Sequence, residues 1–271
     1  MTAVIASFVG AIPEYYDNCL GPAWFDDFAA DLARRLPSHP PGDVLEIACG
    51  TGLVSRHLRK RLDPEVGLIA TDLSQSMLDY ATAKLRDLPG IEWRVADAVA
   101  LPYDDRRFGA VVCGFGVMFV PEKEAALSEI FRVLDHQGIL LFNVWDGVDE
   151  NPHVAASAGV VEGLFPGDVE MRFRIPYEMN DTALLRRLVT QAGFVDVQIE
   201  KRRIELGSCS ARTIATGAIR GTPRSLLIEK RGIPLDDVIE KVTAALTRIG
   251  GADPYRGPCQ AIVVQARRPP D

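Results

Sequence analysis

The stretch VLEIACGTGLVS, residues 44–55, decides the fold of this 271-residue chain. Three of its first four residues are apolar, which is typical of a short buried parallel strand. The small residues that follow, with Gly50 and Gly52 among them, predict a tight turn where the backbone can approach a ligand. Leucines and valines then recur at helical spacing over residues 53–62, so the turn opens onto a helix N-terminus. This order of elements predicts a doubly wound α/β fold.

Acidic residues follow the next two predicted strands. Residues 66–71 form an apolar run that ends in Asp72, 22 residues after Gly50, and residues 91–95 lead to Asp97. In folds of this kind an acid about 20 residues past the turn hydrogen-bonds ribose hydroxyls. A glycine-rich turn alone equally fits an ordinary strand–helix connection, so it is Asp72 that favours a nucleoside site.

Two motifs resemble those of a known enzyme family. The string E-x-A-C-G-T-G, residues 46–52, resembles motif I of the class I S-adenosylmethionine-dependent methyltransferases, which usually have Gly where this chain has Ala48. The string DLSQSMLDYA, residues 72–81, resembles their post-I motif. The cofactor implied by this resemblance is S-adenosylmethionine, with S-adenosylhomocysteine as the product.

The resemblance also implies roles for individual residues. Asp72 would hold the ribose, Leu73 would lie against the adenine, and Asp97 would accept from the adenine amino group; a solvated loop acid or a helix cap is the alternative for Asp97. Phe115 also belongs to the cofactor-binding residues that the resemblance implies. Facing an apolar acceptor and packing beneath the next helix explain it equally well. The full implied cofactor set is Tyr16, Glu46, Ala48, Gly50, Gly52, Asp72, Leu73, Met77, Asp97, Ala98 and Phe115.

Taken as a whole, the chain resembles small-molecule methyltransferases related to the ubiquinone and menaquinone C-methyltransferases. This resemblance implies a Rossmann-like α/β fold: a seven-stranded, mostly parallel sheet with the last strand antiparallel and helical cap insertions. The predicted single domain 1–271 divides into an N-terminal helical cap (1–42), a cofactor-binding core (43–147), cap insertions (148–180 and 207–256) and the rest of the sheet (181–206 and 257–271). The later strands are expected at 110–113, 138–145, 193–203 and 260–266. The family usually has Asp where this chain has Gly109, a change that we expect at the surface.

Methyl transfer from a sulfonium needs proximity and exclusion of water more than an activated protein nucleophile. A fixed catalytic residue is therefore not required, and the catalytic residue stays unknown from sequence. A general base would help an acidic acceptor by roughly 10²–10⁴-fold. The candidates lie on segments expected to cover the site: His153, Tyr15, Tyr16, Asp17 and Tyr177. Surface or core packing is the alternative for His153, and core packing is the alternative for Tyr15 and Tyr16.

Composition limits the partners. The formal net charge of -7 argues against a general nucleic-acid binder, because phosphate contacts need clustered Lys and Arg. Residues 151–271 alone carry 17 basic against 14 acidic residues, which fits either a solvated surface or an acidic substrate. No apolar run is long enough for membrane insertion, and no basic residue precedes the apolar N-terminus as in a signal peptide.

Five scattered cysteines without a C-x-x-C pair predict a reducing, cytoplasmic location and no metal site. The expected partner is a small-molecule acceptor, and a homodimer is compatible with the sequence. Two other classes stay open: an NAD-linked oxidoreductase, which would use the same sheet and Asp72, and a non-catalytic protein that binds S-adenosylmethionine. The sequence does not distinguish oxygen, nitrogen and carbon as the methylated atom.

Overall fold

A computed structural model describes residues 8–172 and 175–270. In this part of the chain seven strands form one sheet in the order β3-β2-β1-β4-β5-β7-β6, and β7 runs antiparallel to both of its neighbours. The predicted fold class is therefore confirmed. The strands are β1 (Val44–Ile47), β2 (Leu68–Asp72), β3 (Ile91–Val95), β4 (Phe108–Gly114), β5 (Leu134–Trp145), β6 (Val195–Leu206) and β7 (Gly257–Arg267).

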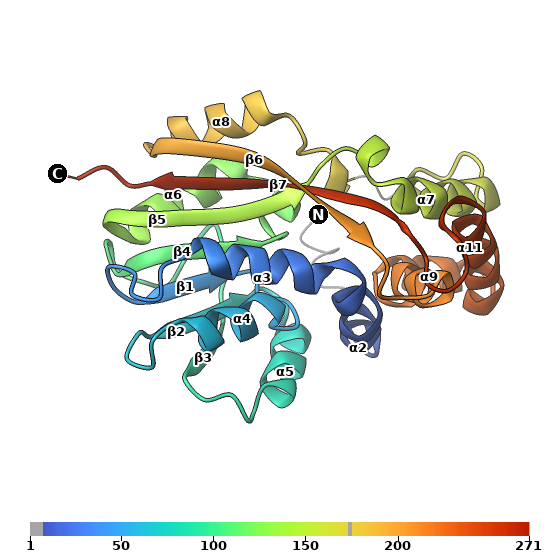
Figure 1. Ribbon diagram of the computed structural model, residues 1–271, viewed down its shortest axis with the longest axis horizontal. Coiled ribbons are helices and arrows are strands. Elements are labelled where there is room, and N and C mark those ends of the chain that lie inside the picture. The colour runs from blue at the N-terminus through green and yellow to red at the C-terminus, as the bar shows by residue number, and fades with distance from the viewer. Residues whose placement is uncertain (1–7, 173–174, 271) are drawn as a thin grey trace.

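The central strands are buried on both faces because helices cover both sides of the sheet. All four residues of β1 are buried, and the register Val44↔Leu68 and Val44↔Ala110 places β1 between two parallel neighbours. Two groups of helices pack on opposite faces, as Figure 1 shows. One face carries α3 (Asp26–Arg35), α4 (Leu53–Arg61) and α5 (Gln75–Lys84), and the other carries α6 (Lys123–Val133) and α8 (Thr182–Gln191).

A helical cap lies beyond the carboxyl ends of the central parallel strands (Figure 1). Its N-terminal part is a continuous helical run of α2 (Ile12–Tyr15) and the π-helical segment η1 (Tyr16–Phe25), which leads into α3. The rest is α7 (Pro152–Leu164), α9 (Ala211–Arg220), α10 (Arg224–Lys230) and α11 (Leu235–Gly250). Residues 221–223 and Pro234 interrupt the C-terminal helices, because neither a tight Gly-Thr-Pro turn nor a proline continues a helix.

The contact between α9 and η1 is close because glycine faces it. A Cβ added at Gly217 would lie 2.4 Å from the Leu20 side chain, and one added at Gly221 would lie 2.8 Å from the backbone nitrogen of Tyr16. No larger residue fits at either position without separating the two segments. The first and last thirds of the chain therefore meet directly in the cap.

Several strand ends differ from the predicted ones. β5 begins at Leu134 rather than at residue 138, because Leu134 already pairs with Phe108 before a register shift in β4. β6 continues to residue 206 and β7 already begins at residue 257, because the two backbones pair along almost the whole length of β6. Much of this added length is polar or lies at turns, and hydrophobic patterns do not reveal backbone pairing there.

The expectation that Gly109 lies at the surface was wrong. Gly109 lies within β4 and is buried. A Cβ there would come within 2.4 Å of the carbonyl carbon of Pro41, so the loop before β1 leaves no space for a side chain. The glycine thus allows residues 41–42 to cross directly over the start of β4.

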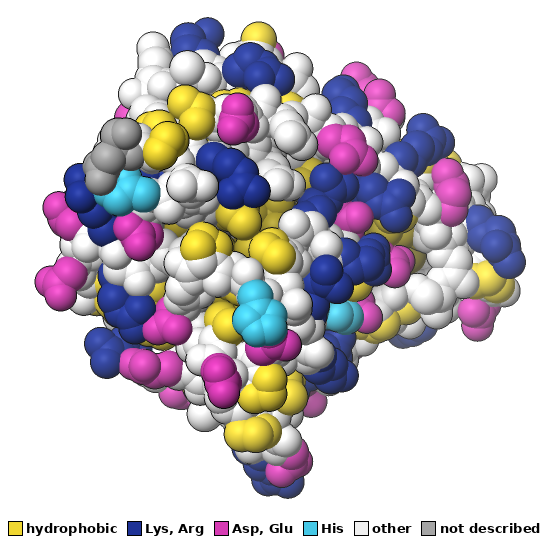
Figure 2. Space-filling model, turned by 60° about the vertical axis from the view of Figure 1, so that its left-hand side comes forward, with side chains coloured by type: hydrophobic (Ala, Val, Ile, Leu, Met, Phe, Trp, Pro, Cys, Tyr) yellow, Lys and Arg dark blue, Asp and Glu magenta, His cyan; other side chains and the backbone are white. Residues whose placement is uncertain are grey.

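Charged side chains of both signs are interspersed on the face drawn in Figure 2. Ion pairs join the edge strand β6 to α3: Arg35 contacts Glu200 at 2.9 Å and Asp31 at 2.6 Å, and Arg202 lies 3.6 Å from Asp31. Lys201 and Arg202 of the second half thus pair with Asp146 and Asp31 of the first. In the described ranges, no helix combines the length and the apolar character that a bilayer crossing requires.

Candidate functional site

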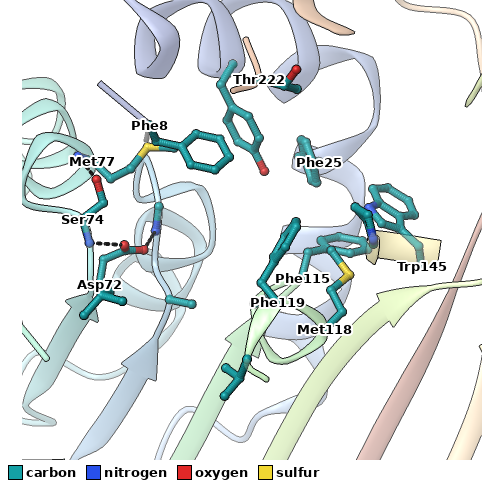
Figure 3. Close-up of a pocket in the computed structure, with 18 of the residues that line it drawn as sticks. Phe8, Phe25, Asp72, Ser74, Met77, Phe115, Met118, Phe119, Trp145 and Thr222 are labelled. Carbon is teal, nitrogen blue, oxygen red and sulfur yellow. Dashed lines mark hydrogen bonds between the residues drawn. The ribbon is translucent and has the colours of Figure 1, made fainter. Parts of the chain in front are cut away.

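A cavity of about 250 Å³ lies between the cap and the carboxyl ends of the parallel strands. Gly50, Asp72 and Asp97, at the ends of β1, β2 and β3, all line it. Figure 3 shows its two sides: Asp72 and Ser74 lie on one, and Phe115, Phe119 and Trp145 on the other. The sheet therefore brings the three predicted strand tips to a single space.

Asp72 is fixed at the end of β2 by the backbone. Its Oδ2 accepts a hydrogen bond from the Gly50 N–H at 2.8 Å, and its Oδ1 accepts one from the Ser74 N–H at 2.8 Å (Figure 3). Burial raises the pKa of this carboxyl group, while the two N–H donors oppose that shift. Each carboxylate oxygen can still accept a further hydrogen bond. Asp72 is therefore oriented to receive a pair of hydroxyl groups.

The turn after β1 needs small residues for two separate reasons. Gly50 has φ +54°, and a Cβ added there would meet no atom within 4 Å, so the cavity itself occupies that direction. Ala48 has φ +52°, a conformation that costs an alanine more than the glycine usual in the resembling family. Gly52 does not line the cavity. A Cβ added there would lie 2.9 Å from the Leu85 side chain and 3.1 Å from the Trp93 side chain, so this glycine is needed for packing.

A polar recess of about 50 Å³ adjoins the turn. Glu46, Thr51 and Asn143 line it, and each has a buried atom without a hydrogen-bond partner among the described residues: Oε2, Oγ1 and Nδ2, respectively. Burial raises the pKa of Glu46 to about 8, with a smaller contribution from the Asp72 carboxylate. Buried polar groups are normally satisfied, so this recess has the donors and acceptors for a small charged group or for water.

The predicted adenine side also lines the cavity. Leu73, Met77, Asp97 and Ala98 all contribute to the wall, and Asp97 Oδ1 accepts a hydrogen bond from the Val99 N–H at 3.1 Å. Phe8, which the sequence analysis did not consider, completes this side next to Met77 (Figure 3). The result is an apolar slot with one carboxylate at its edge.

Aromatic rings form the opposite wall. Phe115 and Trp145 are stacked with centroids 4.0 Å apart, and Trp145 lies 6.1 Å from Tyr177 at an interplanar angle of 26°. Phe115 has φ +56°, and its N–H donates to Asn143 Oδ1 at 2.9 Å. Trp24 and Phe25 of η1 also line the cavity. This wall is therefore aromatic and apolar, which suits an apolar molecule that carries a ring.

Three of the five base candidates line the cavity: Tyr16, His153 and Tyr177. His153 is only 2% exposed, its ring lies 4.7 Å from that of Trp24, and its Nδ1 has no hydrogen-bond partner among the described residues. Burial lowers the pKa of His153 to about 4, so the imidazole is neutral near pH 7. Burial raises the pKa of both tyrosines, which keeps them protonated. His153 alone of these three has a basic lone pair at neutral pH.

The other two candidates lie outside the cavity. The Arg220 guanidinium stacks over the Tyr15 ring at 5.6 Å. Asp17 is ion-paired with Lys84 and accepts a hydrogen bond from the Tyr80 hydroxyl at 3.3 Å. Asp17 thus joins the cap to α5, and neither residue reaches the space where an acceptor could bind.

Arg224, at the start of α10, is the main cavity residue that sequence analysis missed. It is 7% exposed, and burial lowers the pKa of its guanidinium to about 10. The only sequence signal was the excess of basic residues after residue 150, which does not single out one arginine.

The fold is Rossmann-like, and part of the chain matches methyltransferases in comparisons with known proteins. Residues 44–138 match the model of a methyltransferase domain. The chain is 39% identical over 98 residues to a demethylmenaquinone methyltransferase of Lactobacillus johnsonii, covering 35% of this chain and 40% of the relative. It is 35% identical over 101 residues to a ubiquinone/menaquinone biosynthesis C-methyltransferase of Idiomarina loihiensis, covering 36% and 40%.

A solved structure of a Haemonchus contortus phosphoethanolamine N-methyltransferase, in complex with phosphomonomethylethanolamine and S-adenosylhomocysteine, has a TM-score of 0.57. It is 15% identical and covers 96% of this chain and 61% of its own, a likeness of fold alone. The chain spans about two fifths of the length of these two sequence relatives. Residues 44–138 thus form a methyltransferase domain, which confirms the resemblance found in the sequence.

Proposed function

We propose that this protein transfers a methyl group from S-adenosylmethionine to a small-molecule acceptor. The observation that carries the proposal is the convergence of Gly50, Asp72 and Asp97 on one cavity, within the segment that matches a methyltransferase domain. In this proposal Asp72 accepts hydrogen bonds from the ribose hydroxyls, and the slot beside Leu73 and Met77 holds the adenine. The open space at Gly50 lets the chain of the cofactor pass.

The polar recess fits the methionine end of this cofactor. An α-amino acid offers an ammonium group and a carboxylate, and the atoms without partners at Glu46, Thr51 and Asn143 include both acceptors and donors. When bound, S-adenosylmethionine supplies a methyl group that its sulfonium already activates, and it leaves as S-adenosylhomocysteine. Glu46 would then face a cation, which favours its ionised form.

On the acceptor side, the protein has to orient the acceptor, exclude water and receive a proton. The stacked rings of Phe115 and Trp145 provide an apolar surface that excludes water next to the Gly50 turn. An O–H, N–H or acidic C–H acceptor loses one proton as its new bond to carbon forms. His153, neutral and with a free Nδ1 lone pair, is our candidate to accept that proton.

Binding measurements separate this function from its alternatives. We expect S-adenosylhomocysteine to bind in a calorimeter and NADH not to bind; the reverse would favour an oxidoreductase. Protein incubated with methyl-labelled S-adenosylmethionine and a metabolite extract should then transfer label to a compound of low molecular mass, detected by mass spectrometry. Cofactor binding without transfer to any fraction of the extract would favour a non-catalytic binding protein.

The location and assembly of the protein stay predictions. All five cysteines are free thiols, which supports a reducing compartment such as the cytoplasm. Sedimentation of the purified protein would test whether it forms a homodimer.

A further inference from the structure

The acceptor side of the cavity contains a buried cation. Among the described residues that line the cavity, Arg224 contributes the one guanidinium or ammonium group. The acids that line the same cavity are Asp72 and Asp97, on the strand tips, and the exposed Glu122. Arg224 belongs to the cap instead, two residues after Thr222, which lies across the cavity from Asp72 in Figure 3. The cap thus brings a positive charge to a wall built mostly from aromatic rings.

From these positions, and on the basis of the methyl transfer proposed above, we infer that the acceptor is a flat, apolar carboxylic acid whose carboxylate pairs with Arg224. Arg224 has contacts within the protein, and its planar guanidinium can in addition donate to a carboxylate in a bidentate manner. Phe115, Trp145 and Tyr177 all line this half of the cavity, so an apolar ring system can pack against their side chains. Such an acceptor matches the two kinds of group that line this half of the cavity.

Arg224 lines the cavity, and other groups of the protein lie near it. Tyr177 and the half-buried Glu162 of α7 lie near enough to favour the charged guanidinium, yet burial outweighs both and lowers its pKa. A guanidinium has five N–H donors in a planar fork, so it can keep one protein contact and still bind a carboxylate. The neutral His153 adds no competing positive charge at neutral pH.

The charge balance favours a carboxylate over a phosphate. A single guanidinium in an apolar wall neutralises one negative charge, whereas a phosphate monoester carries nearly two at pH 7. In addition, the sulfonium of the cofactor would lie at the other end of the rings, beside the Gly50 turn. The carboxylate at Arg224 would therefore orient the acceptor and leave its far end to receive the methyl group.

Calorimetry on the protein saturated with S-adenosylhomocysteine tests this inference. The probes are benzoate, 2-naphthoate and 4-phenylbenzoate, each compared with its neutral carboxamide, and 2-naphthyl phosphate. We expect at least one acid to bind roughly tenfold to hundredfold more tightly than its amide. In Arg224→Gln the acid and its carboxamide should bind about equally. Arg224→Lys keeps the positive charge but lacks the planar fork of N–H donors, so its preference for the acid should lie between those of the wild type and Arg224→Gln. Arg220→Gln, which changes an arginine of α9 outside the cavity, should behave as the wild type.

Each outcome has a separate meaning. Failure of S-adenosylhomocysteine itself to bind would refute the proposed function. If it binds but no acid of the panel exceeds its amide, or if Arg224→Gln keeps the preference, the acceptor assignment is overturned. Tighter binding of 2-naphthyl phosphate than of 2-naphthoate would also overturn the choice of a carboxylate. Should Arg224→Gln fail to fold, as judged by its melting curve, the ratio in Arg224→Lys decides.

Discussion

The two halves of the cavity are built in different ways. The proposed cofactor half comes from residues 46–98, where Gly50, Asp72 and Asp97 lie at or just after the ends of β1, β2 and β3 and backbone N–H groups fix Asp72. The acceptor half draws Trp24, His153, Tyr177 and Arg224 from separate segments of the cap. Local spacing therefore determines the first half, whereas tertiary packing assembles the second. Changes in the first half should affect cofactor binding, and changes in the second should affect the acceptor or the cap.

The largest expected effect is in the cofactor half, at Gly50→Val. A branched side chain at φ +54° would be strained and would fill the space left for the ligand, so affinity for S-adenosylhomocysteine should fall by roughly a hundredfold or more. Gly232→Val is the matched control, because Gly232 also has positive φ (+76°) and open space but lies outside the cavity. Equal affinities of the two variants in calorimetry would contradict our view of the turn.

In the acceptor half, His153 should make the protein sensitive to acid. Its pKa is about 4 in the folded protein against an ordinary value of 6.5, so between these values the unfolded chain binds more protons and stability falls as pH falls. Between pH 7 and pH 4 the free energy of unfolding should decrease by up to roughly 3 kcal/mol from this group. Urea unfolding of His153→Phe should lack this part of the loss, whereas the exposed-site variant His39→Gln should retain it. An identical pH dependence in His153→Phe and the wild type would show that His153 is not buried neutral.

Asp72→Asn tests the ribose assignment. The amide has one oxygen instead of two, so affinity for S-adenosylhomocysteine should weaken by roughly 1–3 kcal/mol in calorimetry. The control is Asp79→Asn on α5, whose carboxylate contacts Gln75 outside the cavity. The ribose contact would be refuted by a wild-type affinity in Asp72→Asn.

The smallest expected effect concerns protons at Glu46. Because its pKa is about 8 before binding and a cation would lower it, cofactor binding at pH 7 should release close to one proton. Affinity should rise with pH and level off above about 8. Calorimetry in buffers of different ionisation enthalpy measures this release, and Glu46→Gln should abolish it while the exposed Glu92→Gln should not. If the wild type releases no proton on binding, the proposal that Glu46 faces the ammonium group of the cofactor is refuted.

The sequence predicted the core of the fold and the convergence of three strand tips on one cavity for a physical reason. A strand buried on both faces must be apolar, and a parallel strand must end where its turn begins, so the positions of Gly50, Asp72 and Asp97 follow from local patterns. The ends of β6 and β7 were missed because backbone pairing continues through residues that carry no hydrophobic signal. Gly109 was misjudged because only the folded chain brings Pro41 against it.

The acceptor half could not be predicted to the same depth. An amphipathic pattern indicates that one side of a helix is buried, but it does not tell whether that side meets the core or a cavity. Trp24 therefore looked like a packing residue, and Arg224 was one basic residue among 17 in the second half of the chain. Which of them reach the ligand depends on how the cap helices lie on the sheet.

The glycine contacts between α9 and η1 link the two ends of the chain mechanically. Gly221 lies against the backbone of Tyr16 and Gly217 against the side chains of Cys19 and Leu20, so little space is left for a displacement between the two segments. We expect these segments to shift as one rigid unit when a molecule enters or leaves. Deletion of the residues before Asp26 would then disturb the C-terminal helices, which are distant in sequence, while the sheet stays intact.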